Sequence, residues 1–98
     1  MTGKTQVERL SDLRVAELAA SVPDWSLGEG MISRQFDFAD FVESMAFVNR
    51  VAALAEERDH HPDIEISYNH VRIDLSTHRV GGLTEKDFEL AQAVDGLI

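Results

Sequence analysis

The longest regular pattern of apolar and polar positions lies between residues 38 and 58. Apolar residues recur there at spacings of three and four, and neither glycine nor proline interrupts them, which predicts a helix over Phe38–Arg58. We expect Asp37 to cap this helix, and Asp40 favours the positive end of its dipole. The apolar positions form two adjacent stripes: Phe41, Met45, Val48, Ala52 and Ala55 in one, and Phe47, Val51 and Leu54 in the other. Because one stripe suffices to cover a small sheet, the second predicts another contact, most simply with a second copy of the chain.

Two other segments alternate between apolar and polar residues, which is typical of strands. Between Trp25 and Phe38, the turn signal Gly28-Glu29-Gly30 precedes an alternating run, so this segment predicts a β-hairpin. Between Ile64 and Leu75, two alternating runs flank the polar pair Asn69-His70, which predicts a second hairpin folded at that pair.

A shorter helix is predicted at each end of the chain. Ser11 is expected to cap the first, which must stop before Pro23 because proline disfavours helical geometry in the residue ahead of it. Thr84 opens the last helix after Gly81-Gly82, with Asp87 three positions later as its capping-box partner. The order of elements predicts an α+β fold, in which an antiparallel four-stranded sheet carries three helices on one face, in the order α-β-β-α-β-β-α.

Composition narrows the class of protein. The 98 residues predict one domain over 1–98, and residues 1–6 are expected to form a disordered terminus. Eighteen acidic against nine basic residues give a formal charge of −9, which argues against direct binding to nucleic acid. The chain has no cysteine and no apolar run approaching the roughly 20 residues that a membrane span needs. We therefore expect a cytoplasmic protein with no membrane contact.

Three of the four histidines bracket the second predicted hairpin. His60 and His61 precede it, and His78 follows it. The limbs 62–69 and 70–77 are of equal length, so the folded hairpin is expected to bring His78 beside the other two. Because histidine titrates near neutral pH, such a cluster can donate and accept protons in one site.

Other interpretations of these residues stay open. An exposed histidine near a helix end can simply complement the helix dipole. A zinc site would use histidine and carboxylate ligands, but adjacent histidines seldom point at one ion and no His-x-x-x-His spacing occurs, so no metal is expected. Asp87 is expected to act mainly as the capping partner of Thr84, and Trp25 to lie in the core rather than against a ligand.

The residues with the strongest spacing signal resemble those of the pterin-4a-carbinolamine dehydratase family. They are Glu56-x-x-x-His60-His61-Pro62, Tyr68, Ser76-Thr77-His78, Gly82-Leu83-Thr84 and Asp87. The resemblance extends from about Trp25 to the last helix. It implies a hydro-lyase, 4a-hydroxytetrahydrobiopterin dehydratase, which converts 4a-hydroxytetrahydropterin to quinonoid dihydropterin plus water in tetrahydrobiopterin recycling. That reaction needs no metal, nucleophile or redox cofactor.

The resemblance also implies roles for individual residues. It gives His60, His61 and His78 as catalytic, with His60 and His78 as the acid/base pair in an order that stays open, and His61 as the main substrate-positioning histidine. The stretches Asp59-His60-His61 and Ser76-Thr77-His78-Arg79 match those that contact the pterin, and Glu56, Pro62 and Asp87 have supporting places. We hypothesise that Glu56 and Asp59 orient the imidazoles and favour their protonated forms.

For partners, the resemblance implies a pterin substrate and a homodimer or homotetramer. Members of the family also act as protein-binding modules, including as a dimerisation cofactor of a transcription factor in animals. A homo-oligomeric interaction module with little or no catalysis is therefore the alternative function, and a role in molybdenum-cofactor metabolism is a third. The resemblance leaves the side chain of the physiological pterin open.

Overall fold

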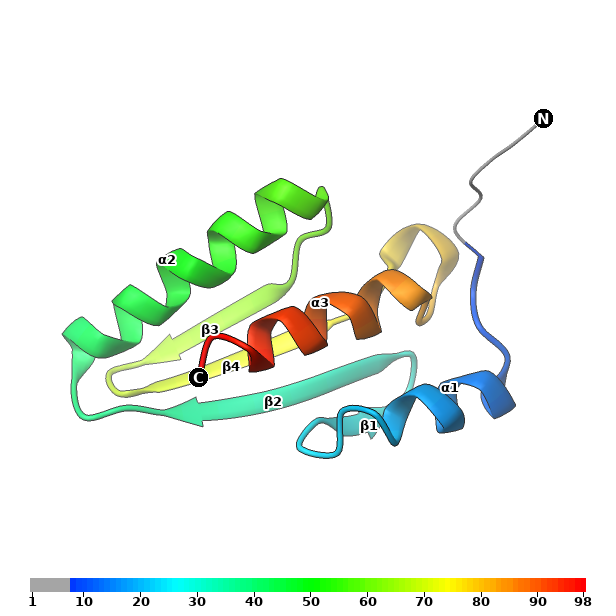
Figure 1. Ribbon diagram of the computed structural model, residues 1–98, viewed down its shortest axis with the longest axis horizontal. Coiled ribbons are helices and arrows are strands. Elements are labelled where there is room, and N and C mark those ends of the chain that lie inside the picture. Colours follow the sequence, from blue (N-terminus) through cyan, green and yellow to red (C-terminus); the bar gives the residue numbers. More distant parts are fainter. Residues whose placement is uncertain (1–7) are drawn as a thin grey trace.

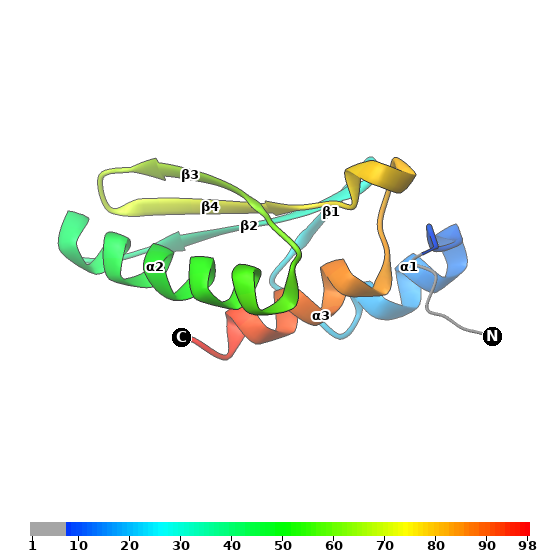
Figure 2. The ribbon, with the colours of Figure 1, turned by 90° about the horizontal axis from the view of Figure 1, so that it is seen from above.

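The computed structural model describes residues 8–98, and the expected disordered terminus lies outside them. The elements are α1 (Asp12–Ala19), β1 (Ser26–Gly28), β2 (Met31–Asp37), α2 (Phe41–Arg58), β3 (Asp63–Ser67), β4 (His70–Leu75), the short 3-10 helix η1 (His78–Val80) and α3 (Glu85–Asp95). The strands form one antiparallel sheet in the order β1-β2-β4-β3. All three α-helices lie on one side of that sheet (Figures 1 and 2). The predicted α+β fold is confirmed, and η1 is an addition to it.

Helix α1 begins as predicted, with the Ser11 hydroxyl oxygen accepting a hydrogen bond from the backbone N–H of Arg14. Helix α2 begins at Phe41, later than the sequence pattern suggests. Its cap is Asp40, whose carboxylate accepts a hydrogen bond from the Glu43 N–H at 2.9 Å. The prediction that Asp37 caps α2 is wrong, because Asp37 is still paired with β4 as the last residue of β2.

The second hairpin turns at Tyr68-Asn69 rather than at Asn69-His70. Ser67 pairs directly with His70, so His70 is the first residue of β4. Tyr68 occupies the left-handed region with a φ of 51°, a conformation that glycine, asparagine and aspartate adopt more readily. The sequence pattern therefore pointed one residue too far along the chain.

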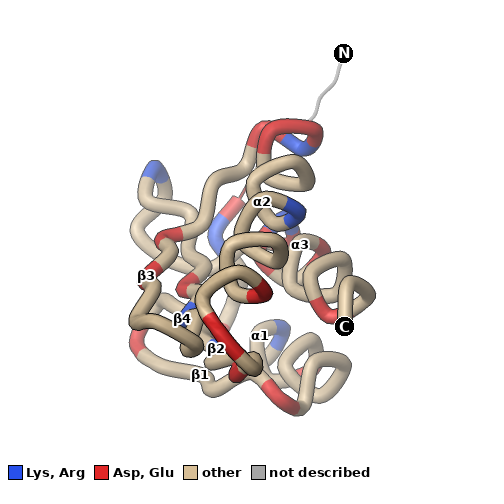
Figure 3. Tube along the Cα trace, turned by 90° about the vertical axis from the view of Figure 1, so that its left-hand side faces the viewer, with Lys and Arg blue, Asp and Glu red and all other residues tan. Residues whose placement is uncertain are grey.

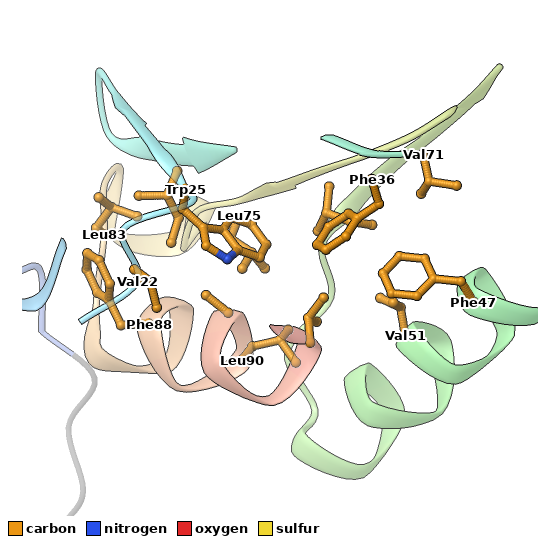
Figure 4. Packing of buried hydrophobic residues seen from close by; sticks show 14 residues of the cluster. Val22, Trp25, Phe36, Phe47, Val51, Val71, Leu75, Leu83, Phe88 and Leu90 are labelled. Carbon is orange, nitrogen blue, oxygen red and sulfur yellow. The ribbon is translucent and has the colours of Figure 1, made fainter. Parts of the chain in front are cut away.

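The core lies between the sheet and the helices (Figure 4). Trp25 is 6% exposed, as expected for a core residue, and its indole N–H donates to Asp95 Oδ1 at 2.8 Å. The rings of Phe36 and Phe47 pack with their centroids 4.7 Å apart, which ties β2 to α2. The sheet and the two longer helices thus share one apolar interior.

Helix α2 buries only part of its apolar surface. Its buried residues are Ser44, Phe47, Val51 and Ala55. By contrast, Phe41 is 47% exposed and Val42 is 75% exposed. The helix therefore exposes apolar side chains that its packing against the sheet does not bury. None of the helices described between residues 8 and 98 combines the length and apolar character that crossing a bilayer requires.

Candidate functional site

Several segments meet near one end of the sheet: the residues that follow α2, the start of β3, the loop that contains η1, and the first turn of α3 (Figure 1). Antiparallel pairing of β3 with β4 places the residues before Asp63 next to those after Leu75. An open cavity of about 290 Å³ lies there, lined by Asp59, His60, His61, Ser76, Thr77, His78, Arg79 and Lys86. The three histidines thus surround one cavity, as the hairpin geometry predicts.

His60 is held in place by a buried carboxylate. Its Nε2 lies 2.6 Å from Oδ1 of Asp87, and the side chains of His60 and Asp87 are 11% and 0% exposed. We assign the proton in this contact to Nε2, the tautomer that lets an Asp87 carboxylate, which only accepts hydrogen bonds, be satisfied. The Nδ1 atom of His60 is then the ring nitrogen left for a substrate.

The other oxygen of Asp87 ties two further segments to the site. Oδ2 accepts hydrogen bonds from the hydroxyl of Thr77 at 2.8 Å and from the backbone N–H of Thr84 at 2.9 Å. The second of these is the capping-box contact at the start of α3, so the predicted capping role is confirmed. Asp87 does more than cap the helix. Its carboxylate also contacts the His60 imidazole and the hydroxyl of Thr77, which follows β4, so one side chain links His60, the end of β4 and the start of α3.

The loop after β4 is closed by backbone contacts. The N–H of Thr77 donates to the carbonyl oxygen of Gly82 at 2.9 Å. Between them, Gly81 adopts a φ of 68°, which an L side chain would strain. This closure holds His78 and Arg79 in η1 at the cavity.

His61 and His78 face different carboxylates from the one that holds His60. His61 Nε2 lies 2.5 Å from Oε2 of Glu56, and both side chains are more than half exposed. His78 Nε2 lies 3.9 Å from Oδ2 of Asp63, which is too long for a hydrogen bond but close enough for electrostatic attraction. Within the described part of the chain, no hydrogen bond joins two of these imidazoles.

Of the two carboxylates expected to orient imidazoles, Glu56 does contact one. Asp59 instead ends α2 in a left-handed conformation, with its backbone N–H bonded back into the helix. Among residues 8–98, its side chain makes no hydrogen bond to an imidazole, and Asp87 takes that place at His60. Pro62, half-buried, follows directly and leads into β3.

Lys86 is a cavity residue that sequence reasoning missed. It lines the cavity from the first turn of α3, one position before Asp87. The sequence offers one signal for it, which is that Lys86 directly precedes Asp87, a residue of the motif. The distance in sequence from Lys86 to the histidines does not by itself indicate that they meet.

Two further observations delimit the site. A larger cavity of about 610 Å³ lies between the start of α1, the β1–β2 turn and Gly81-Gly82, and the described residues that line it include no histidine. Across residues 8–98, no three histidine, aspartate or glutamate side chains are grouped so that they could hold a metal ion. The three converging histidines therefore mark the smaller cavity as the candidate site.

With this fold and site, the chain belongs to the family described as pterin 4 alpha carbinolamine dehydratase, whose model matches residues 8–97. It is 54% identical over 90 residues to a protein of Chloroflexus aurantiacus named "Putative pterin-4-alpha-carbinolamine dehydratase", covering 92% of this chain and 97% of that protein. A protein of the same name from a Picosynechococcus species is 48% identical, with 91% and 97% covered.

Solved structures share the fold. The crystal structure of a transcriptional coactivator/pterin dehydratase from Brucella melitensis matches with a TM-score of 0.87 and 33% identity, over 92% of this chain and 98% of that one. A pterin dehydratase-like protein identified as a RuBisCO assembly factor in the alpha-carboxysome matches with a TM-score of 0.64 and 31% identity, over 76% and 88%.

Proposed function

We propose that this chain dehydrates 4a-hydroxytetrahydropterin to quinonoid dihydropterin plus water. The observation that carries this proposal is the cavity with three histidines, one of which is locked to the buried Asp87. In the reaction, the C4a–O bond and the N5–H bond break and a C4a=N5 double bond forms. The leaving oxygen takes up one proton and N5 gives up one, so an acid and a base are needed and no electrons are exchanged.

His60 suits the role of base. Asp87, 2.6 Å from its Nε2, stabilises the imidazolium that forms when Nδ1 accepts the N5 proton. His78 suits the role of acid for the leaving hydroxyl, because its 77% exposed side chain exchanges protons readily with water. The two residues thus divide the proton transfers between a fixed, largely buried imidazole and an exposed one.

The remaining cavity residues position the substrate on this proposal. His61, oriented by Glu56, contacts the pterin, and the Ser76 backbone offers hydrogen bonds to the flat pyrimidinone ring. The Thr77 hydroxyl donates to Asp87, which fixes Thr77, the neighbour of Ser76, beside the cavity. The chain would then serve tetrahydrobiopterin recycling in the cytoplasm.

The experiment that tests this assignment compares His60→Ala, His78→Ala and the double variant. Each single variant is expected to lose roughly 100-fold or more in kcat. The double variant should be no faster than the slower single one, because the two groups act in one event. His70→Ala is the matched control, since His70 lies outside the cavity at the start of β4. Near-normal turnover by a folded double variant would contradict the assignment of His60 and His78 as the acid/base pair.

A protein-interaction module is the second candidate function. Exposed apolar side chains favour it, namely Phe41 and Val42 on α2 and Ile66 and Tyr68 at the β3 end. Two solved relatives are described as a transcriptional coactivator/pterin dehydratase and as an assembly factor. We propose that these positions serve self-association, which is compatible with either function.

A further inference from the structure

Two cationic side chains line the cavity in a chain that is otherwise strongly acidic. The sequence has nine basic against eighteen acidic residues, and the basic positions are sparse along the fold (Figure 3). Arg79 reaches the cavity from η1 and Lys86 from the first turn of α3. Two of the few basic side chains of this chain therefore lie at the same small cavity.

Within residues 8–98, neither Arg79 nor Lys86 forms a salt bridge with a carboxylate, whereas Arg34 and Arg72 each do. The carboxylates around the site are engaged instead by the imidazoles: Asp87 by His60, Glu56 by His61 and, at longer range, Asp63 by His78. Among the described residues that line the cavity, Asp59 is the acidic one, so the two cations outnumber it.

Helix stability does not account for Lys86. It lies in the first turn of α3, where the helix dipole favours negative side chains such as Glu85 and Asp87 and disfavours positive ones. A lysine at this position is therefore unfavourable for the helix. Its half-buried side chain is better explained by a negative group that enters the cavity.

We propose that the site takes a pterin whose side chain carries a negative charge, bound at the rim by Arg79 and Lys86. This inference rests on the proposed dehydratase function and deepens it. The pyrimidinone ring needs only hydrogen bonds, so the two cations are free to contact the substituent. The Arg79 guanidinium presents parallel N–H groups that match a carboxylate or a phosphate, and the Lys86 ammonium adds a point charge.

The test compares kcat/KM for three 4a-hydroxytetrahydropterins that differ only in the side chain: a neutral hydroxyalkyl group, its phosphate ester, and a carboxylate analogue. The wild-type protein should prefer the anionic substrates by about tenfold at low salt, and less at high salt. The two anionic arms show whether phosphate or carboxylate is the better partner. Equal kcat/KM for neutral and anionic substrates would overturn the inference.

Variants assign the preference to these residues. In the Arg79→Gln/Lys86→Gln double variant the ratio of anionic to neutral kcat/KM should fall to about one, whereas Asp59→Asn should raise it. Arg50→Gln is the control for loss of a positive charge elsewhere, because it removes one from α2 outside this cavity and should leave the ratio unchanged. A ratio that survives in the double variant overturns the inference.

Failure of the dehydratase proposal is recognised separately. If the folded wild-type protein accelerates no substrate, the proposed function fails. Binding of stable dihydropterins with and without the phosphate, measured by fluorescence titration, then tests the inference alone. Tighter binding of the phosphorylated ligand that is lost in the double variant supports it, and equal binding overturns it.

Discussion

The Nε2 atom of His60 lies 2.6 Å from the Oδ1 atom of Asp87, although the two residues are 27 positions apart in the sequence. The contact joins the segment that follows α2 to the first turn of α3. Because the same carboxylate also caps α3 and holds Thr77, the local structure of the fold and the orientation of the imidazole depend on one buried group.

Replacement of this group tests its effect on the imidazole. In Asp87→Asn, one oxygen can still accept from Thr77 and Thr84, but the new amide donates to His60. His60 Nε2 must then accept, and the proton moves to Nδ1, the atom proposed to act as base. We expect kcat to fall by at least about tenfold and the pH profile to change, with a loss of about 1–3 kcal/mol in the free energy of unfolding.

Glu56→Gln is the comparison for that variant. The Glu56–His61 pair is exposed, so its removal should cost less in both turnover and stability. If Asp87→Asn showed the turnover and pH profile of the wild type, the proposed role of the His60–Asp87 contact would be contradicted.

The loop that carries His78 depends on a glycine. Gly81 has a φ of 68° and open space where a Cβ would stand, so Gly81→Ala tests backbone conformation without a clash. We expect a loss of about 1–2 kcal/mol in unfolding free energy by urea denaturation, together with reduced turnover. Gly28→Ala, at a position without positive φ and with ordinary contacts, should cost less. Equal losses would argue against conformational strain at Gly81.

A pH-dependent contribution to stability is expected at the opposite end of the sheet. Hydrogen bonds from His70, at 2.6 Å, and from Gln35 lower the pKa of Asp37 below its ordinary 3.8. A carboxyl with a lowered pKa in the folded state stabilises the fold above its unfolded pKa, and this contribution is lost as the pH falls through the folded pKa.

The stability advantage of the wild type over Asp37→Asn should therefore be present at about pH 6 and shrink towards about pH 3. Chemical denaturation at a series of pH values measures it. Because Asp37 is exposed, the effect should be small and weaken with added salt. An advantage that grows on acidification would contradict this linkage.

Self-association is expected to involve the exposed apolar side of α2. Size-exclusion chromatography with light scattering should show a dimer or tetramer for the wild type. Phe41→Glu and Val42→Glu should reduce the mass, because they place charges where apolar contact is expected. Arg50→Glu, on another side of the same helix, is the control. A wild-type monomer would contradict this interpretation of α2.

Much of the fold could be predicted because its elements carry strong local patterns. Helix α2 is periodic and free of glycine and proline, and the Thr84–Asp87 capping box has a short, specific spacing. The sequence pattern places the start of α2 too early, because Asp37 pairs with His70 in the sheet. This pairing is a tertiary contact that the local pattern does not contain. The turn at Tyr68 was misplaced because its residue type is unusual for a positive φ.

The candidate site also has features that the sequence predicts and features that depend on tertiary packing. The convergence of His60 and His78 follows from hairpin geometry, which a sequence count can capture. The pairing of His60 with Asp87 and the approach of Lys86 arise where α3 packs beside the cavity, and no sequence spacing encodes that packing. Long-range contacts of this kind required the structure.

Stopped-flow dehydration of freshly generated 4a-hydroxytetrahydropterin, followed by pterin absorbance, tests the dehydratase function itself. The wild-type protein should accelerate the reaction by roughly 100-fold or more over the rate without protein, and His78→Ala should lose that acceleration while remaining folded. No acceleration by folded wild-type protein would contradict the dehydratase function and favour the protein-interaction function instead.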